Sequence, residues 1–168
     1  MSDATLTPAS TRPVDHLLAR YGESHQNDTN ERIHWICVPV IVWTVIALLW
    51  SIPTPDAFSA LPLLNWATLT LAGALAYYVY LSPPLAAGLA VFSATSVALI
   101  VGYESTALAS TLPLWGLALS LFVLAWIGQF VGHQIEGKKP SFLDDLTFLL
   151  IGPAWLLHFV YRKLGVAY

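Results

Sequence analysis

Positive charge is missing from the long middle of this 168-residue chain. All seven Lys and Arg residues lie before Ile33 or after Ile135, and the only charged side chains between these positions are Asp56 and Glu104. A water-soluble domain of this size would scatter charge along its whole length. With 57% hydrophobic and 10% charged residues, the sequence predicts an integral membrane protein that forms a single domain over residues 1–168.

Other absences narrow the class of protein. Cys37 is the single cysteine, so it cannot form an intramolecular disulfide and is expected to be a small buried apolar residue. The polar residues 1–32 lack the apolar core of an export signal. The sequence contains no nucleotide-binding loop or redox-coenzyme motif and nothing that indicates nucleic acid. Its five histidines are too few for the eight-histidine di-iron hydroxylases and desaturases.

Four apolar blocks are present, and crossing about 30 Å of hydrocarbon takes about 20 residues each. Proline-containing breaks separate them, and they cover residues 33–52, 62–81, 84–103 and 112–131. Four crossings place both termini and the turn at residues 82–84 on one side, together with every Lys and Arg. The positive-inside rule makes that side cytoplasmic, in the inner membrane of a bacterium or the endoplasmic reticulum of a eukaryote. The predicted fold class is an all-α membrane protein with four transmembrane helices.

A fifth apolar stretch lies near the C-terminus, in residues 142–163. Its apolar run, residues 146–160, is only 15 residues long, is interrupted by a Gly-Pro pair and is followed by an Arg-Lys pair. Because a fifth span would move these cations to the far side, we expect an interfacial or re-entrant helical segment on the cytoplasmic side. A capping pattern at Ser141 and Asp144 is expected to begin it.

Polar residues gather just before the first span. A continuous helix would place His25 and His34, nine residues apart, on opposite faces. Asn27, Asp28 or Asn30 can cap a helix that begins between the two histidines. A loop is then expected to fold His25 back toward His34.

A second group of polar residues closes the fourth span. His133 and Glu136 are three residues apart, the usual spacing of two ligands on one helical face. Ionisable groups at membrane depth are costly and tend to mark function, and neutral imidazole is a common metal ligand. The sequence is compatible with two roles for His158, a hydrogen-bonded structural residue or a metal ligand. His16 is expected to be solvated. The pair Lys138 and Lys139 fits a headgroup contact or the attraction of a fatty-acid carboxylate.

These motifs resemble those of the Mpo1-like family of small membrane proteins. The resemblance covers nearly the whole chain, and its carriers are Tyr21, the His25–Asn30–His34 spacing, Gln129-Phe-Val-Gly-His133, Glu136 to Pro140, Gly152-Pro153 and Lys163-Leu-Gly165. It implies an iron(II)-dependent dioxygenase that uses O2 to shorten long-chain 2-hydroxy fatty acids by one carbon, as in fatty acid α-oxidation. Iron(II) (Fe²⁺) is the implied cofactor, and membrane lipid surrounds the chain.

The resemblance also implies roles for individual residues. The implied metal ligands are His25, His34 and His133, with Glu136 or His158 completing the shell. Tyr21 and Asn30 would orient an imidazole or the bound acid, and Lys138 and Lys139 would attract the substrate carboxylate. Two alternatives stay open: a b-type haem protein that uses two of these histidines, and a metal-free membrane scaffold or carrier.

Overall fold

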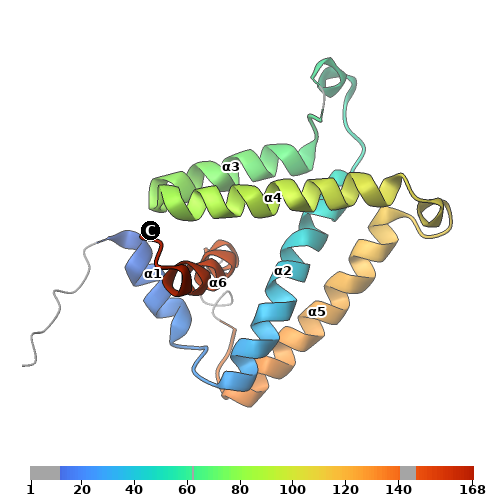
Figure 1. Ribbon diagram of the computed structural model, residues 1–168. Helices are drawn as coiled ribbons and strands as arrows, with labels where there is room; N and C mark the ends of the chain where they lie inside the picture. Colours follow the sequence, from blue (N-terminus) through green and yellow to red (C-terminus); the bar gives the residue numbers. More distant parts are fainter. Residues whose placement is uncertain (1–11, 62, 141–146) are drawn as a thin grey trace, which may run out of the picture.

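The computed structural model describes residues 12–61, 63–140 and 147–168, and within them the chain is all-helical (Figure 1). The described residues form six α-helices and two 3-10 helices and no strand. The elements are α1 (Pro13–Gly22), α2 (Asp28–Trp50), η1 (Asp56–Ala60), α3 (Trp66–Leu81), α4 (Pro83–Glu104), η2 (Ala107–Ser110), α5 (Leu114–Glu136) and α6 (Phe148–Leu164). The expected cap at Ser141 and Asp144, and the start of the second expected span at Pro62, lie outside the described residues.

Three of the described helices are long and apolar enough to cross a membrane: α2, α4 and α5, with mean hydropathies of 2.1, 2.1 and 1.9. The second expected span is represented by α3, which is apolar but has only 16 residues. At 1.5 Å per residue, α3 is about 24 Å long, shorter than the hydrocarbon layer. It begins only at Trp66 because Asn65 and Thr68 form a reciprocal capping box.

The closest helix pair is α2 with the antiparallel α5, which lie side by side (Figure 1). Two glycines on α5, one turn apart, allow this approach. A Cβ at Gly128 would lie 2.7 Å from Cys37 Sγ, and a Cβ at Gly132 would collide with Asn30 Oδ1. Small residues spaced by four are the usual device for close helix packing in membranes. The buried position of Cys37 confirms the expectation for the single cysteine.

Two terminal helices cover one end of this pair. α1 packs on α6, and α6 also contacts α2 and α4. Tyr78 donates a hydrogen bond to the Leu150 carbonyl, and Tyr161 donates one to the Pro84 carbonyl, both at 2.7 Å. These bonds hold the turn at residues 82–84 beside α6.

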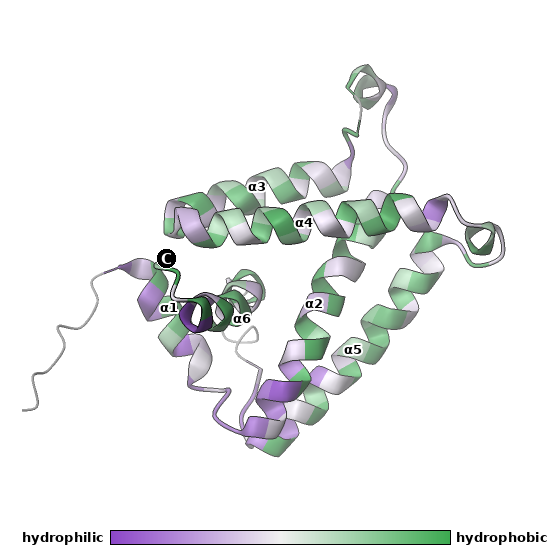
Figure 2. Cartoon of the chain, in the orientation of Figure 1, coloured by the Kyte–Doolittle hydropathy of each residue, from purple (hydrophilic) through white to green (hydrophobic). Residues whose placement is uncertain are grey.

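The α3–α4 hairpin runs in a different direction from the α2–α5 pair (Figure 1). Helices that are parallel in space stay parallel in every view, so the α3–α4 hairpin is inclined to the α2–α5 pair and the four helices do not form a parallel bundle. Colouring by hydropathy shows hydrophilic residues gathered where α2 begins and α5 ends, while α3 and α4 are largely hydrophobic (Figure 2). The polar end of the α2–α5 pair therefore holds the candidate site.

Candidate metal centre

The first turn of α2 determines where His25 lies. Asn27 caps the helix, because its Oδ1 accepts hydrogen bonds from the backbone N–H groups of Thr29 at 2.9 Å and Asn30 at 3.4 Å. The helix therefore begins at Asp28, between the two histidines, and the preceding loop folds His25 back over His34. This confirms the expected helix start and identifies Asn27 as the cap.

Three buried imidazoles converge at this point. His25 comes from the loop, His34 from α2 and His133 from α5, and one ring nitrogen from each lies within 4.8 Å of the others. Their exposed fractions are 4%, 1% and 5%. The ring centroids of His34 and His133 are 5.0 Å apart. His25 and His133, more than a hundred positions apart in the chain, thus belong to one cluster.

Backbone carbonyls fix the orientation of two of these rings. His25 Nδ1 lies 2.6 Å from the Tyr21 carbonyl, and His34 Nδ1 lies 2.9 Å from the Asn30 carbonyl. A carbonyl only accepts hydrogen bonds, so each Nδ1 carries the proton and each neutral ring presents an Nε2 lone pair. The two Nε2 atoms are only 2.9 Å apart. Two lone pairs this close repel each other unless a cation lies beside them.

A metal ion fits this arrangement better than a proton does. Burial, followed by the neighbouring His34, lowers the pKa of His25 to about 3, which disfavours a proton shared between the two rings. Histidine nitrogens bind metals at about 2.0–2.1 Å, which places two neighbouring ligand nitrogens about 3.0–3.4 Å apart. His133 Nδ1 is buried and has no hydrogen-bond partner among the described residues. The donor set and its geometry therefore suit a divalent transition metal.

Glu136 holds the His25 loop instead of joining the cluster. Its two carboxylate oxygens accept hydrogen bonds from the backbone N–H groups of Gln26 at 2.9 Å and Asn27 at 2.8 Å. Asn30, which is fully buried, donates from Nδ2 to Glu136 Oε2 at 3.1 Å and to the Ser24 carbonyl at 3.2 Å. The carboxylate thus joins the end of α5 to the start of α2 and keeps His25 in position.

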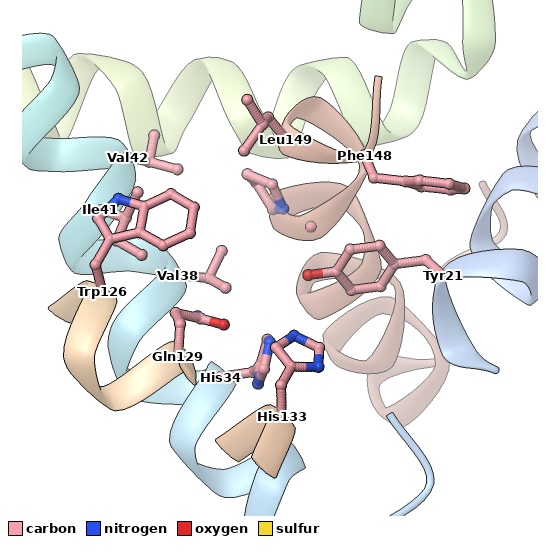
Figure 3. Close-up of a pocket in the computed structure, with 12 residues that line it drawn as sticks. Tyr21, His34, Val38, Ile41, Val42, Trp126, Gln129, His133, Phe148 and Leu149 are labelled. Atoms are coloured by element: carbon pink, nitrogen blue, oxygen red, sulfur yellow. The ribbon is translucent and has the colours of Figure 1, made fainter. Parts of the chain in front are cut away.

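Aromatic rings enclose His25 from the other side. The Tyr21 ring stacks on it with a centroid distance of 4.2 Å and an interplanar angle of 12°, and the Trp155 ring centroid lies at 5.2 Å. Burial raises the pKa of Tyr21 above its usual range, so its hydroxyl stays protonated. That hydroxyl points into a cavity beside the histidines (Figure 3).

This cavity has a polar end and an apolar end. Its volume is about 50 Å³, and His34, His133, Gln129 and Tyr21 line the polar end (Figure 3). The Nε2 of Gln129 is buried and has no hydrogen-bond partner among the described residues, so it can donate to a ligand. The remaining walls are apolar and come from α2, α5 and α6: Val38, Ile41, Val42, Trp126, Phe148, Leu149, Gly152 and Pro153.

The other histidines and the lysines of the sequence prediction lie elsewhere. His158 Nδ1 contacts the Trp155 carbonyl at 2.5 Å, and its ring is not part of the three-histidine group. Lys138 donates to the Glu23 carbonyl at 2.5 Å, and both Lys138 and Lys139 are exposed and do not line the cavity. His16 is exposed on α1, as expected.

Sequence reasoning missed two residues of the site. Gln129 was noted only as part of a motif, although it lies one helical turn before His133 and so shares its face of α5. Trp155 had no signal at all, because its contact with His25 depends on how α6 packs against α1. Local spacing identifies neighbours on one helix, but it does not identify partners across a tertiary contact.

Comparison with known proteins bears on this site. The family described as 2-hydroxy-palmitic acid dioxygenase Mpo1-like matches residues 11–164. The chain belongs to the Mpo1-like family. It is 28% identical over 150 residues to 2-hydroxy-palmitic acid dioxygenase MPO1 of Saccharomyces cerevisiae, an alignment that covers 88% of this chain and 79% of the yeast protein. No solved structure matches the chain.

Proposed function

We propose that this Mpo1-like protein is an iron(II)-dependent dioxygenase that converts a long-chain 2-hydroxy fatty acid and O2 into the acid one carbon shorter, carbon dioxide and water. The observation that carries the proposal is the pair of Nε2 lone pairs 2.9 Å apart, beside a third buried imidazole. The yeast relative is named as a dioxygenase of 2-hydroxy-palmitic acid. The reaction removes four electrons from the substrate, which one O2 accepts, so no external reductant is needed.

In this proposal His25, His34 and His133 hold the iron. When bound, the ion supplies the electron exchange with O2 that side chains alone cannot perform. Glu136 and Asn30 position the His25 loop. The Tyr21 and Asn30 carbonyls orient the imidazoles of His25 and His34, as is usual around metal sites.

The polar end of the cavity provides groups that can bind the head of a 2-hydroxy acid. Gln129 Nε2 and the Tyr21 hydroxyl line this end, and both are hydrogen-bond donors. We propose that they bind the carboxylate or the hydroxyl of the acid. This assignment replaces the two exposed lysines, which would contact lipid headgroups instead.

The geometry disfavours the haem alternative. Two axial imidazoles of a haem must lie on opposite faces of the ring. The 2.9 Å between the Nε2 atoms of His25 and His34 leaves no room for a porphyrin between this pair, so His133 would have to be one of the two haem ligands. A cavity of about 50 Å³ beside them is also too small for such a cofactor.

We further propose four spans with both termini on the cytoplasmic side. Trp66 at the start of α3 donates to the Pro53 carbonyl at 3.2 Å, and the turn that ends α3 lies beside α6, so α3 returns from the far end of α2 to the side of the site. Single cysteines at Thr54 or Ser110, in a Cys37→Ala background, should react with an impermeant maleimide from outside, and one at Lys139 only after lysis. The reverse pattern would refute the orientation.

The direct test of the reaction uses protein purified without oxygen and loaded with iron(II). Incubation with 2-hydroxypalmitate and O2 should release pentadecanoic acid and one CO2 for each O2 consumed, as measured by mass spectrometry and an oxygen electrode. His133→Ala should be inactive, and His16→Ala should match the unchanged protein. If no shortened acid forms at any chain length while iron stays bound, the proposed reaction is wrong.

A further inference from the structure

A second cavity lies directly beside the candidate metal centre. It is a groove of about 160 Å³ between α2, α4 and α6, and every residue that lines it is apolar. Three residues, Val38, Val42 and Pro153, line both this groove and the metal-site cavity. The groove therefore adjoins the site, and these three side chains lie at the boundary between the two cavities.

Each of the three helices contributes a residue with a small or constrained side chain to the lining of the groove. Pro39 lies inside α2, Pro153 lies inside α6, and Gly88 lies on α4. A Cβ at Gly88 would lie 2.7 Å from Leu157 Cδ2, so the glycine allows α6 to approach α4 and form one wall. The Tyr161 hydrogen bond to the Pro84 carbonyl fixes the same contact.

We propose that this groove, called the acyl groove below, binds the alkyl chain of the 2-hydroxy acid. The proposal rests on the proposed function for the identity of the head group. The cavity at the histidines is too small for a long alkyl chain, at about 50 Å³, so the chain must leave it. The adjoining acyl groove offers an apolar surface that begins at the three shared side chains and ends near Trp35 and Val160.

The length of the groove determines how much of the chain it can hold. Trp35 and Val42 mark its extent on α2, and seven residues of helix rise about 10 Å. This is shorter than an extended palmitic chain. The part nearest the head therefore packs against Leu89 and Leu156, and the distal part passes Val160, which is 36% exposed, into lipid.

Photo-crosslinking tests the location of the chain without relying on turnover. The probe is a 2-hydroxy fatty acid with a diazirine in mid-chain, applied to the whole protein in detergent, and the labelled residues are mapped by mass spectrometry. We expect labels on the lining residues of α4 and α6, above all Leu89, Phe92 and Leu157, and we expect excess 2-hydroxypalmitate to suppress them. A diazirine-bearing phosphatidylcholine should instead label Leu124 and Ile127 on the outer face of α5, which are 64% and 55% exposed.

Substitutions test whether the groove selects chain length. Val160→Trp narrows the mouth, and we expect kcat/KM for long chains to fall about tenfold relative to short chains, the effect of misfitting about one methylene group in an apolar pocket. Phe92→Ala widens the groove and should favour longer or branched chains. Val91→Trp is the matched control, because Val91 is 68% exposed on α4 and does not line the groove.

The possible outcomes distinguish a failure of the acyl-groove proposal from a failure of the proposed reaction. Labels in the groove that 2-hydroxypalmitate suppresses, without any acid shortening, would support binding of the alkyl chain in the acyl groove and refute the proposed dioxygenase reaction. Acid shortening with labels confined to the outer face of α5, and with Val160→Trp behaving like Val91→Trp, would refute the groove. Groove labels that the phospholipid probe matches and 2-hydroxypalmitate does not displace would identify a site for membrane lipid and would also refute it.

Discussion

The two ends of the α2–α5 pair are formed by the same two helices but bury different chemistry. At the far end, Ile46 and Ala47 of α2 pack with Leu114 and Ala118 of α5, and all four side chains are apolar and buried. At the other end the buried side chains are polar: Asn30 and His34 from α2, Gln129 and His133 from α5. The pair is thus an apolar helix contact at one end and a hydrogen-bonded network at the other.

The difference shows which end is maintained for a reason other than stability. Lipid competes poorly with close apolar packing, so contacts such as Ala47 with Ala118 are sufficient to hold two helices together. Buried imidazoles and amides at membrane depth are costly even when they are hydrogen-bonded. Two polar nitrogens of the network, in Gln129 and His133, have no partner among the described residues. These features indicate a site that binds a ligand.

The two ends of the α2–α5 pair also differ in the helices that cover them. α1 and α6 cover the polar end, with Tyr21 and Trp155 enclosing His25. At the far end, Ala67 of α3 and Ile100 of α4 join the apolar cluster, and the described connections there are the short 3-10 helices η1 and η2. The exposed Glu104 accepts a hydrogen bond from Trp50 at 3.2 Å. α1 and α6, which are not among the three long apolar helices, thus enclose the site.

The largest effect is expected from removing one imidazole at the polar end. His25→Ala, His34→Ala or His133→Ala should each lower bound iron from about one per chain to near background. Loss of a ligand should exceed the roughly 10–100-fold loss of metal affinity typical for groups that only orient a ligand. Elemental analysis of protein purified without oxygen measures this. Full iron content in all three variants would exclude the ligand set.

A smaller effect is expected from Glu136→Gln, which keeps the shape of the side chain and removes its charge. Its carboxylate accepts hydrogen bonds from two backbone N–H groups and from Asn30, so the loop that carries His25 should loosen. We expect metal affinity to fall by roughly 10–100-fold, with one iron still bound at saturation. Titration with iron(II) gives both quantities. A loss of stoichiometry as complete as for His34→Ala would instead make Glu136 a ligand.

Much of the polar end could be predicted from the sequence, because its information is local. The helix start between His25 and His34 depends on capping residues, and the shared face of His133 and Gln129 depends on helical periodicity. The positions of α2, α4 and α5 follow from apolar length. The resemblance to the Mpo1-like family, carried by the same motifs, is confirmed by the family match.

What the sequence did not reveal depends on contacts between distant segments. The i, i+3 spacing of His133 and Glu136 predicts two ligands on one helix, but the carboxylate lies against the start of α2 because backbone N–H groups are available there. Hydropathy extends the second span to residue 62, yet the capping box at Asn65 begins α3 later. The inclination of the α3–α4 hairpin to the α2–α5 pair, with α6 in contact with both α2 and α4, is a tertiary arrangement that no periodicity encodes.

A mutation at the apolar end should separate stability from metal binding. Ile46 is 4% exposed and belongs to the apolar cluster at the end of the α2–α5 pair away from the histidines, so Ile46→Ala removes buried packing there. Because lipid is as apolar as isoleucine, only the lost packing lowers the free energy of unfolding. We expect a decrease of about 1–2 kcal/mol, below the roughly 2–5 kcal/mol usual for a water-soluble protein. Thermal unfolding in detergent should show a lower midpoint, with unchanged iron per folded chain. A fall in iron content would show that the two ends are coupled.

The smallest effect is expected from His158→Ala, which tests whether the metal site includes a fourth histidine. The structure places this ring against Phe159, with centroids 4.1 Å apart, and its Nδ1 on the Trp155 carbonyl, outside the three-histidine group. Burial lowers the pKa of His158, so the ring is neutral at neutral pH and its loss removes no buried charge. We expect iron content and affinity within about twofold of the unchanged protein and a stability cost of about 1 kcal/mol from lost packing and one hydrogen bond. The exposed His16→Ala serves as the matched control, and a loss of iron in His158→Ala that His16→Ala does not share would make His158 the fourth ligand.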